Sequence, residues 1–446
     1  MQEVKIDLGS TLAHSMLSEL HNSSSNNQGK AKPNHIPRVP PNIRNIDNAA
    51  YDPKVISIGP YHHGKSGLQS MEDHKKRYLR EFLTCEPENS SITTDVGELE
   101  KLDSLINTVR ISEKELLSWY SLPPNIKSDD FIKMIVLDGC FILRLLIKFR
   151  VRSERGEDPI FLVGNLLPLL RGDLLLLENQ LPFFILEKLY ELIQKPDSKR
   201  LTLKEFAFAY LTFKDSTGSV NNLEVYHLLH LYDLILLPKV RDVQSNQNAL
   251  STVSSATKLK VVPSTVPSAT KLKEAGIKLL PAKEADNFLE VFYVKGKLQI
   301  PCLKITDVTI PIFRNLIAFE QCCPIAGNHF TAYTRFMDLM VNNTEDVKVL
   351  EESKIIENKL GSEDEVVHFL NQIFTDVIID HQKHYLTPVF TGIDAYCSSR
   401  WHRHQAKFWQ DYCSSPWAGI SVSAATVLLL LTLLQTIYTI MSYYNI

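Results

Sequence analysis

The chain has 446 residues, with 48 basic and 51 acidic side chains and a formal net charge of −3 at pH 7. This length is enough for one large or two ordinary domains. The near balance of charge excludes the strongly basic surface that binds nucleic acid, so we expect membrane lipid and unknown protein partners instead.

The first 35 residues are polar and low in complexity, as in HNSSSNNQGKAKPN, and we predict a disordered tail. They lack the uninterrupted apolar region of a secretory signal, so membrane insertion would depend on the C-terminal segment. The seven cysteines of the chain are odd in number and scattered, which is unlike a disulfide framework and favours a reducing compartment.

Residues 36–237 are predicted to form the first part of a helical core. A proline-punctuated extended stretch is followed by a helix in MEDHKKRYLREFL, where Ser70 and Asp73 resemble a capping box. The stretch FIKMIVLDGCFILRLLIKF is apolar on nearly all sides and predicts a buried helix. In NLLPLLRGDLLLLENQLPFFILEKLYELI, Pro182 lacks an N–H and would break one long helix into two or start the second. Two further helices are predicted in KEFAFAYLTF and NNLEVYHLLHLYDLILL.

Residues 238–276 contain a tandem duplication, because STVSSATKLKVVP from Ser251 is repeated as STVPSATKLKEAG from Ser264. One repeat of this length is too short for a solenoid, so we predict a low-complexity linker. Residues 277–411 are predicted to form the second part of the core, with a β-hairpin around Lys295-Gly296-Lys297. The predicted fold class is therefore mainly α with a small antiparallel β-hairpin: a helical globular domain plus one C-terminal transmembrane helix.

Residues 412–446 are predicted to form a juxtamembrane segment and a transmembrane helix. The run from Ala418 to Met441 carries no charge and would be ~36 Å long as a helix, against ~30 Å for a bilayer's hydrocarbon core. The alternative, a buried core helix, rarely runs this long without a charge. Just before the span, Cys413 is a candidate for S-acylation, the alternative being an ordinary free thiol. The predicted anchor residues are Trp417, Ala418, Leu428, Leu431, Gln435, Tyr438 and Met441.

The charges beside the span predict its orientation. Arg400, Arg403 and Lys407 precede it, whereas the five residues after Met441 carry only the terminal carboxylate. Positive residues near a span stay cytoplasmic, so we predict a cytosolic large domain on a tail-anchored protein of the plasma membrane or an endomembrane. The exported orientation stays open because three Asn-x-Ser/Thr sequons would be usable only in a lumenal domain. These sequons begin at Asn22, Asn89 and Asn342.

The stretch GPYHHGKS from Gly59 fits the P-loop expression, and Asp138 in MIVLD could serve as the acidic partner that holds Mg²⁺. A phosphate cradle needs successive backbone N–H groups and a helix that starts at the lysine. Pro60 has no N–H, and the capping signal places the helix start near Ser70 instead of Lys65. A nucleotide-binding hydrolase is therefore kept as the alternative function.

Three other polar groups could carry chemistry. His227, His230 and Asp233 fall at helical spacing, but the leucines around them favour packed histidines over metal ligands. The triplet Glu178, Asn179 and Gln180 lies inside a predicted apolar helix and is either catalytic or a buried network around the Pro182 break. The set Cys397, His402, His404 and Cys413 matches no usual zinc-finger spacing. We predict no catalytic, cofactor-binding or metal-binding residue, and no enzymatic activity.

Seven stretches together resemble the plant membrane-protein family known as domain of unknown function 247. In chain order they are PKVISIGPYHHG, MEDHKKRYLREFL, MIVLDGCFIL, RGDLLLLENQLPFFILEKL, ATKLKEAGIK, RNLIAFEQC and PWAGISVSAATVLLLLT. The resemblance runs from about Ile36 to the end of the chain. It implies a membrane protein without established enzymatic activity, and so a recognition or signalling component. The chain departs from the family at His35-Ile36-Pro37, where Cys-Ile-Tyr is usual, and in the duplicated ATKLK unit.

Overall fold

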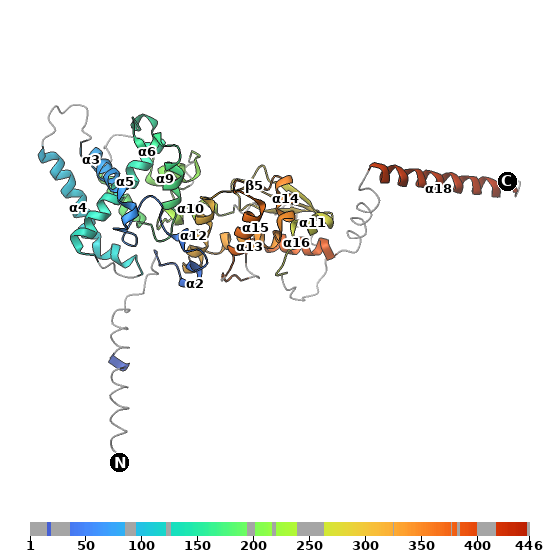
Figure 1. Ribbon diagram of the computed structural model, residues 1–446, viewed down its shortest axis with the longest axis horizontal. Helices are drawn as coiled ribbons and strands as arrows, with labels where there is room; N and C mark the ends of the chain where they lie inside the picture. Colours follow the sequence, from blue (N-terminus) through green and yellow to red (C-terminus); the bar gives the residue numbers. More distant parts are fainter. Residues whose placement is uncertain are drawn as a thin grey trace, which may run out of the picture. The chain divides into compact units, whose positions relative to one another are not determined.

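The computed structural model describes eleven segments of the chain (Figure 1). It divides into two compact units, of which unit 1 comprises Met1–Ile235 and Arg314–Gly327, and unit 2 comprises Leu236–Phe313 and Asn328–Ile446. The predicted N-terminal tail lies outside the described residues except for 16–18. The described residues are 16–18, 36–84, 95–121, 126–193, 201–215, 220–238, 263–323, 325–375, 377–380, 384–398 and 416–443.

Unit 1 is built around α5 (Ser128–Arg150), which is buried along most of its length as predicted and packs against α3, α4, α8 and α9. Gly139 lets α8 approach α5 closely, since a Cβ at this position would lie 2.6 Å from Leu189 Cδ1. The bounds of the other helices are α2 Pro41–Arg44, η1 Asn48–Tyr51, η2 Ser66–Met71, α3 Glu72–Thr84, α4 Asp95–Ser118, η3 Arg152–Glu154, α6 Pro159–Leu162, α7 Leu166–Asp173, α8 Phe183–Ile193, α9 Leu203–Thr212 and α10 Leu228–Leu236.

Two details of unit 1 differ from the sequence prediction. The 3-10 helix η2 contains Ser70, so α3 begins two residues later, at Glu72. The chain leaves the helical conformation after α7 and resumes it at Phe183, directly after Pro182. Pro182 therefore starts the second helix, as one of the two predictions had it, whereas the placement of Glu178, Asn179 and Gln180 inside a helix is wrong. They lie in the connection between α7 and α8.

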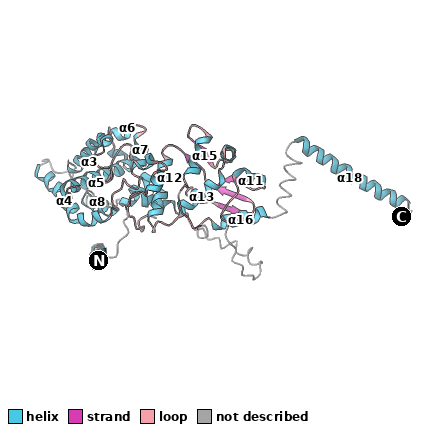
Figure 2. Ribbon diagram, turned by 60° about the horizontal axis from the view of Figure 1, so that its bottom comes forward, coloured by secondary structure: helices cyan, strands magenta, loops and turns pink. Residues whose placement is uncertain are grey.

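Unit 2 contains the predicted hairpin, in which β2 (Phe292–Val294) pairs antiparallel with β3 (Lys297–Ile300). Its two-residue turn has positive φ at Lys295 (46°) and Gly296 (77°), the geometry that matches the twist of paired strands. Two parallel pairings were not predicted: β1 (Lys278–Pro281) with β3, and β4 (Leu303–Ile305) with β5 (Ile356–Asn358). The helices with residues in this unit are α11 Ala269–Glu274, α12 Thr309–Cys322, α13 His329–Met340, α14 Thr344–Glu352, α15 Glu363–Gln372 and α16 Thr387–Ser398. Figure 2 shows the strands as a small part of a mainly helical structure, which confirms the predicted fold class.

The second copy of the duplication corrects the predicted linker. Its ATKLKE forms α11, which buries Ala269 and Leu272 and packs against α14. The Thr270 N–H donates a hydrogen bond of 2.8 Å to Asp346 Oδ1. Residues 263–276 are therefore part of unit 2, while the first copy, from Ser251 to Pro263, lies outside the described residues except at Pro263.

The last helix, α18 (Pro416–Tyr443), contains all seven predicted anchor residues. Its 19-residue stretch Ala424–Ser442 has a mean hydropathy of 1.9 and no part buried in the rest of the protein. Figure 1 shows α18 as one continuous helix at the C-terminal end of the chain. One C-terminal helix is therefore long and apolar enough to span a membrane. The S-acylation candidate Cys413 lies outside the described residues.

Candidate functional site

The polar centre of unit 1 surrounds residues 52–62, which overlap the start of the P-loop candidate GPYHHGKS at Gly59. Asp173, the last residue of α7, accepts hydrogen bonds from the backbone N–H groups of Lys54, Val55 and Ile56 at 2.7–2.9 Å. Asn179 accepts one from the Ile58 N–H at 2.7 Å, and its own amide donates to the carbonyls of Ile56 and Asp173. These buried side chains thus replace a neighbouring strand as hydrogen-bond partners of an extended segment.

Asp138 in the middle of α5 continues this pattern. Its carboxylate accepts a hydrogen bond of 2.8 Å from the Gly59 N–H and lies 2.7 Å from Lys75 Nζ. Lys75 also donates to the Ser57 carbonyl and to Glu72. Burial raises the pKa of Asp138, while Lys75 and the Gly59 N–H act to lower it. The pKa of Lys75 is raised by its carboxylate partners despite the opposing effect of burial.

Gly59 is required by geometry at this point. Its φ is +70°, and a Cβ would lie 2.7 Å from the Gln180 carbonyl oxygen. The Gln180 side chain donates to the carbonyls of Leu174 and Leu176 and accepts from the Leu229 N–H. We call Asp138, Asp173, Asn179 and Gln180 the polar clamp. All four are buried. Their hydrogen bonds stabilise the backbone around residues 52–62, the α7–α8 connection and, at Leu229, the start of α10.

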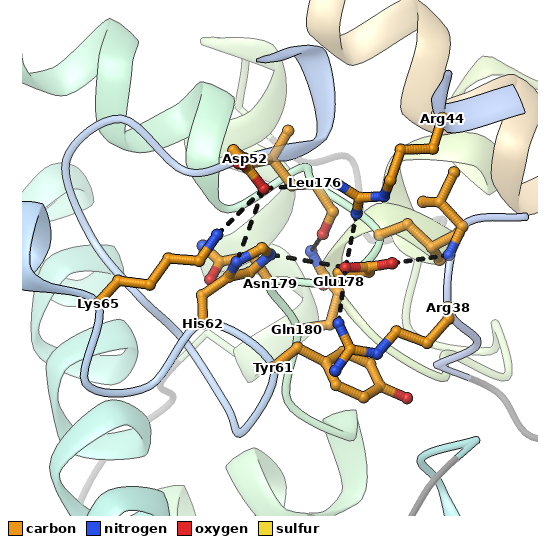
Figure 3. A network of polar contacts seen from close by, with 12 residues as sticks. Arg38, Arg44, Asp52, Tyr61, His62, Lys65, Leu176, Glu178, Asn179 and Gln180 are labelled. Carbon is orange, nitrogen blue, oxygen red and sulfur yellow. Dashed lines mark hydrogen bonds and ion pairs between the residues drawn. The ribbon is translucent and has the colours of Figure 1, made fainter. Parts of the chain in front are cut away.

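Glu178, the remaining member of the triplet, joins a network of charges (Figure 3). One of its carboxylate oxygens accepts from the Val39 N–H at 2.8 Å, and the other lies 3.2 Å from Arg38 and 2.7 Å from Arg44. Arg38 in turn stacks on the Tyr61 ring, with 3.9 Å from its guanidinium carbon to the ring centroid. The network interpretation of the triplet therefore agrees with the structure, because buried polar groups that are paired specify one packing.

His62 lies between two carboxylates in the same network. Its Nε2 is 3.8 Å from Glu178 and its Nδ1 is 3.9 Å from Asp52, and neither nitrogen has a hydrogen-bond partner among the described residues. Burial lowers the pKa of His62 to about 4, so the ring is neutral at pH 7. Burial and the charge of Glu178 raise the pKa of the Cys322 thiol to about 11, so this cysteine is not a thiolate at pH 7.

The stretch GPYHHGKS does not form a phosphate cradle. The Gly59 N–H is used by Asp138, and the Lys65 N–H donates to the His62 carbonyl at 3.3 Å. Lys65 Nζ pairs with Asp52 at 3.2 Å, and a 3-10 helix follows where a P-loop has its α-helix. Asp138 lies within a helix and not at the end of a strand. The geometry gives the nucleotide alternative no support.

The histidines near α10 cap that helix. His227 precedes the first residue of α10, so the prediction that it lies on a helical face is wrong. Its Nδ1 accepts a hydrogen bond of 3.1 Å from the His230 N–H, as an N-cap side chain does. His230 Nδ1 accepts a hydrogen bond of 3.1 Å from the Tyr226 N–H.

The third residue of this group, Asp233, is not a typical metal ligand at neutral pH, because burial, with the charge of Glu320, raises its pKa well above the usual range. Within the described ranges, no three His, Cys, Asp or Glu side chains are placed to hold a metal ion. His402, His404 and Cys413 lie outside those ranges.

A second buried cluster went unnoticed in the sequence. Asp158 caps α6 and accepts hydrogen bonds from Arg77, Tyr78 and Lys148 at 2.6–2.7 Å. Asp173 went unnoticed as well, although a lone carboxylate between two leucine runs is a usable signal. Asp158 directly precedes Pro159, a pattern that predicts a helix start but gives no indication of the buried partners of the carboxylate.

The fold and this centre define a mainly helical protein with an internal polar clamp and a candidate membrane helix. Comparison with known proteins agrees: residues 36–431 match the family DUF247, described as plant protein of unknown function, and the chain belongs to this family. It is 36% identical over 428 residues to UPF0481 protein At3g47200 of Arabidopsis thaliana, covering 92% of this chain and 86% of that protein. Putative UPF0481 protein At3g02645 of the same plant is 20% identical over 472 residues, covering 86% of each. No solved structure matches.

Proposed function

We propose that this protein is a membrane-anchored recognition or signalling component that acts through protein-protein contacts and has no enzymatic activity. The observation that carries the proposal is the exposed apolar stretch Ala424–Ser442 of α18, which needs a lipid environment to cover it. The polar clamp supports it further, because its buried groups bind the protein's own backbone instead of lining a reaction site.

Membrane anchoring is tested by alkaline carbonate extraction of plant membranes that contain the full chain. We expect wild-type protein in the membrane pellet and the double variant Leu428→Arg/Leu431→Arg in the supernatant, since each arginine at a helix centre costs about 2.5–3.5 kcal/mol of insertion free energy. The matched control Ser442→Arg places the charge at the edge of the span and should stay in the pellet. Extraction of the wild type would contradict the anchor.

The enzyme alternatives are tested by thermal shift of the full chain with Mg·ATP and with zinc. A ligand that binds only the folded state stabilises it by about 2.7 kcal/mol at one hundred times its Kd. We expect no shift with either ligand. A shift that Lys65→Ala abolishes, and that Lys76→Ala on the exposed face of α3 preserves, would replace our proposal by a nucleotide-binding function.

We further propose that the large domain faces the cytosol, on the basis of Arg400, Arg403 and Lys407 before the span. Protease added to sealed microsomes should then digest the domain to a small membrane fragment. The competing orientation would protect the domain and glycosylate it, and the exposed Asn342 sequon is a suitable reporter. A protected domain that loses mass on deglycosylation contradicts the cytosolic assignment. Partners should be sought by cross-linking in plant membranes, with the Leu428→Arg/Leu431→Arg variant as control.

A further inference from the structure

Part of the surface of unit 1 exposes apolar side chains beside an edge-to-face pair of aromatic rings and the arginines that lie over them. Phe149 at the end of α5 lies 5.6 Å from Phe213, between ring centroids, and the Arg155 guanidinium lies over both Phe149 (5.7 Å) and Phe161 (4.9 Å). Arg171 lies 4.9 Å over Phe213 from the other direction. The α6–α9 rim comprises these residues together with the exposed tip of α6: Phe149, Arg155, Phe161, Leu162, Val163, Arg171 and Phe213.

Three apolar side chains of the rim are exposed to solvent. Leu162 is 69% exposed, Val163 is 55% exposed and Phe213 is 59% exposed. Phe213 also has φ +58°, a left-handed conformation that is strained for a bulky side chain and that holds its ring at the surface after α9. Single exposed apolar residues are ordinary, whereas exposed apolar residues that lie beside linked aromatic side chains form a patch of the kind that meets a partner.

The charges beside the patch are mostly positive. Arg150, Arg152 and Arg155 follow one another where α5 ends and η3 begins, and Arg171 lies in α7. Of the nearby acids, Asp215 is paired with Arg150, Glu154 with Arg144, and Asp158 with Arg77 and Lys148. Glu157 is exposed as well, so the positive charges that remain beside the patch are Arg152, Arg155 and Arg171 against this one acid. An apolar tip ringed by arginines is complementary to an anionic lipid surface, where apolar side chains enter the interface and guanidinium groups meet phosphates.

We propose that the α6–α9 rim docks unit 1 onto the anionic headgroup surface of the membrane. This inference rests on the proposed function, because α18 would keep the domain close to a bilayer and a cytosolic domain would face the leaflet that carries anionic lipid. A transmembrane helix holds the protein in the membrane by itself, so the rim contact would add orientation: it would fix which face of unit 1 meets the headgroups. Docking would present a defined face of unit 1 to protein partners.

The test is hydrogen exchange of the full chain in lipid nanodiscs that contain either phosphatidylserine with phosphatidylcholine or phosphatidylcholine alone. Amides of residues 160–165 and 211–215 should exchange more slowly in the anionic discs, and added salt should reduce the difference. Peptides around Ile111, which is 85% exposed on α4, serve as the internal reference and should exchange alike in both. Arg152→Glu should weaken the protection, by about fivefold for each positive charge lost near the surface.

The double variant Leu162→Asp/Val163→Asp should abolish the protection at 211–215, whereas Leu192→Asp, a change at an exposed leucine of α8, should leave it intact. Equal exchange of the rim in both discs would overturn the inference and leave the membrane anchor untouched. Protection that appears only after plant membrane proteins are added would also overturn it, in favour of a protein occupant. Failure of the chain to remain in the discs would instead overturn the proposed function.

Discussion

Removing the carboxylate of Asp138 should destabilise unit 1 severely. It is paired with Lys75 at 2.7 Å, the two side chains are only 2% and 1% exposed, and the same carboxylate accepts the Gly59 N–H. Asp138→Ala leaves a buried ammonium whose remaining partners are the Ser57 carbonyl and Glu72. Breaking a buried ion pair in this way costs about 3–5 kcal/mol. That loss is a large share of the ~5–15 kcal/mol by which folded proteins are stable.

The assay is urea unfolding of the full chain in detergent, followed through Trp119, which lies in unit 1. The double variant Lys75→Met/Asp138→Leu removes both charges and should recover part of the lost stability, because apolar replacements of a buried pair are often neutral. Recovery should stay incomplete, because the Gly59 N–H loses its acceptor in both variants. The exposed pair Lys76 and Asp73, at 3.2 Å, is the control, and Asp73→Ala should cost less than about 1 kcal/mol. An Asp138→Ala variant no less stable than this control would refute the reasoning, as would a double variant whose loss equals the sum of the single losses.

Three further predictions concern individual residues. Gly59→Ala should destabilise unit 1 by about 1–3 kcal/mol more than Gly64→Ala in urea unfolding. Both glycines have positive φ, but only at Gly59 would the added Cβ lie 2.7 Å from a carbonyl oxygen. Equal losses of stability would contradict the close approach of Gly59 to the Gln180 carbonyl. The pKa of His62 falls from 6.5 to about 4 on folding, so between these pH values the unfolded state binds more protons than the folded state. The free energy of unfolding should therefore decrease as the pH falls, by about 2 kcal/mol at pH 5. His62→Gln should flatten this pH dependence, and an unchanged slope would contradict the lowered pKa of His62. Cys413 should be S-acylated, which acyl-biotin exchange can check against Cys413→Ser, and equal labelling of the two proteins would exclude it.

Much of the fold could be predicted from hydrophobic patterns because they report burial. The helix α5 reads as apolar on all sides and is buried on nearly all sides, and the Lys295-Gly296 turn reads as a hairpin and forms one. The parallel pairing of β1 with β3 could not be predicted, because parallel strands are not joined by a short turn that the sequence would reveal. Their pairing depends on how the residues between them fold. The folded second repeat, α11, was missed because its polar composition hides the burial of Ala269 and Leu272.

The candidate site was predictable in its residues but not in its geometry. The triplet Glu178-Asn179-Gln180 was visible as polar side chains among leucines, and the network interpretation of it agrees with the hydrogen bonds. That Asn179 and Asp173 bind the backbone of residues 54–58, more than a hundred positions earlier, is set by tertiary packing. A local pattern carries no information about which distant N–H groups need an acceptor.

Five of the seven stretches that resemble the family lie in unit 1 and supply its buried hydrogen bonds. PKVISIGPYHHG supplies the backbone that the polar clamp binds, MEDHKKRYLREFL supplies Lys75, and MIVLDGCFIL supplies Asp138. RNLIAFEQC supplies Asn315, which accepts the Leu177 N–H and donates to the Ala50 carbonyl. Replacing one of these side chains would remove a buried hydrogen bond and destabilise the fold. Their presence therefore indicates the fold and carries no information about a binding partner. Under the proposed function, the residues that select a partner should therefore lie outside these motifs, on exposed surfaces such as the α6–α9 rim.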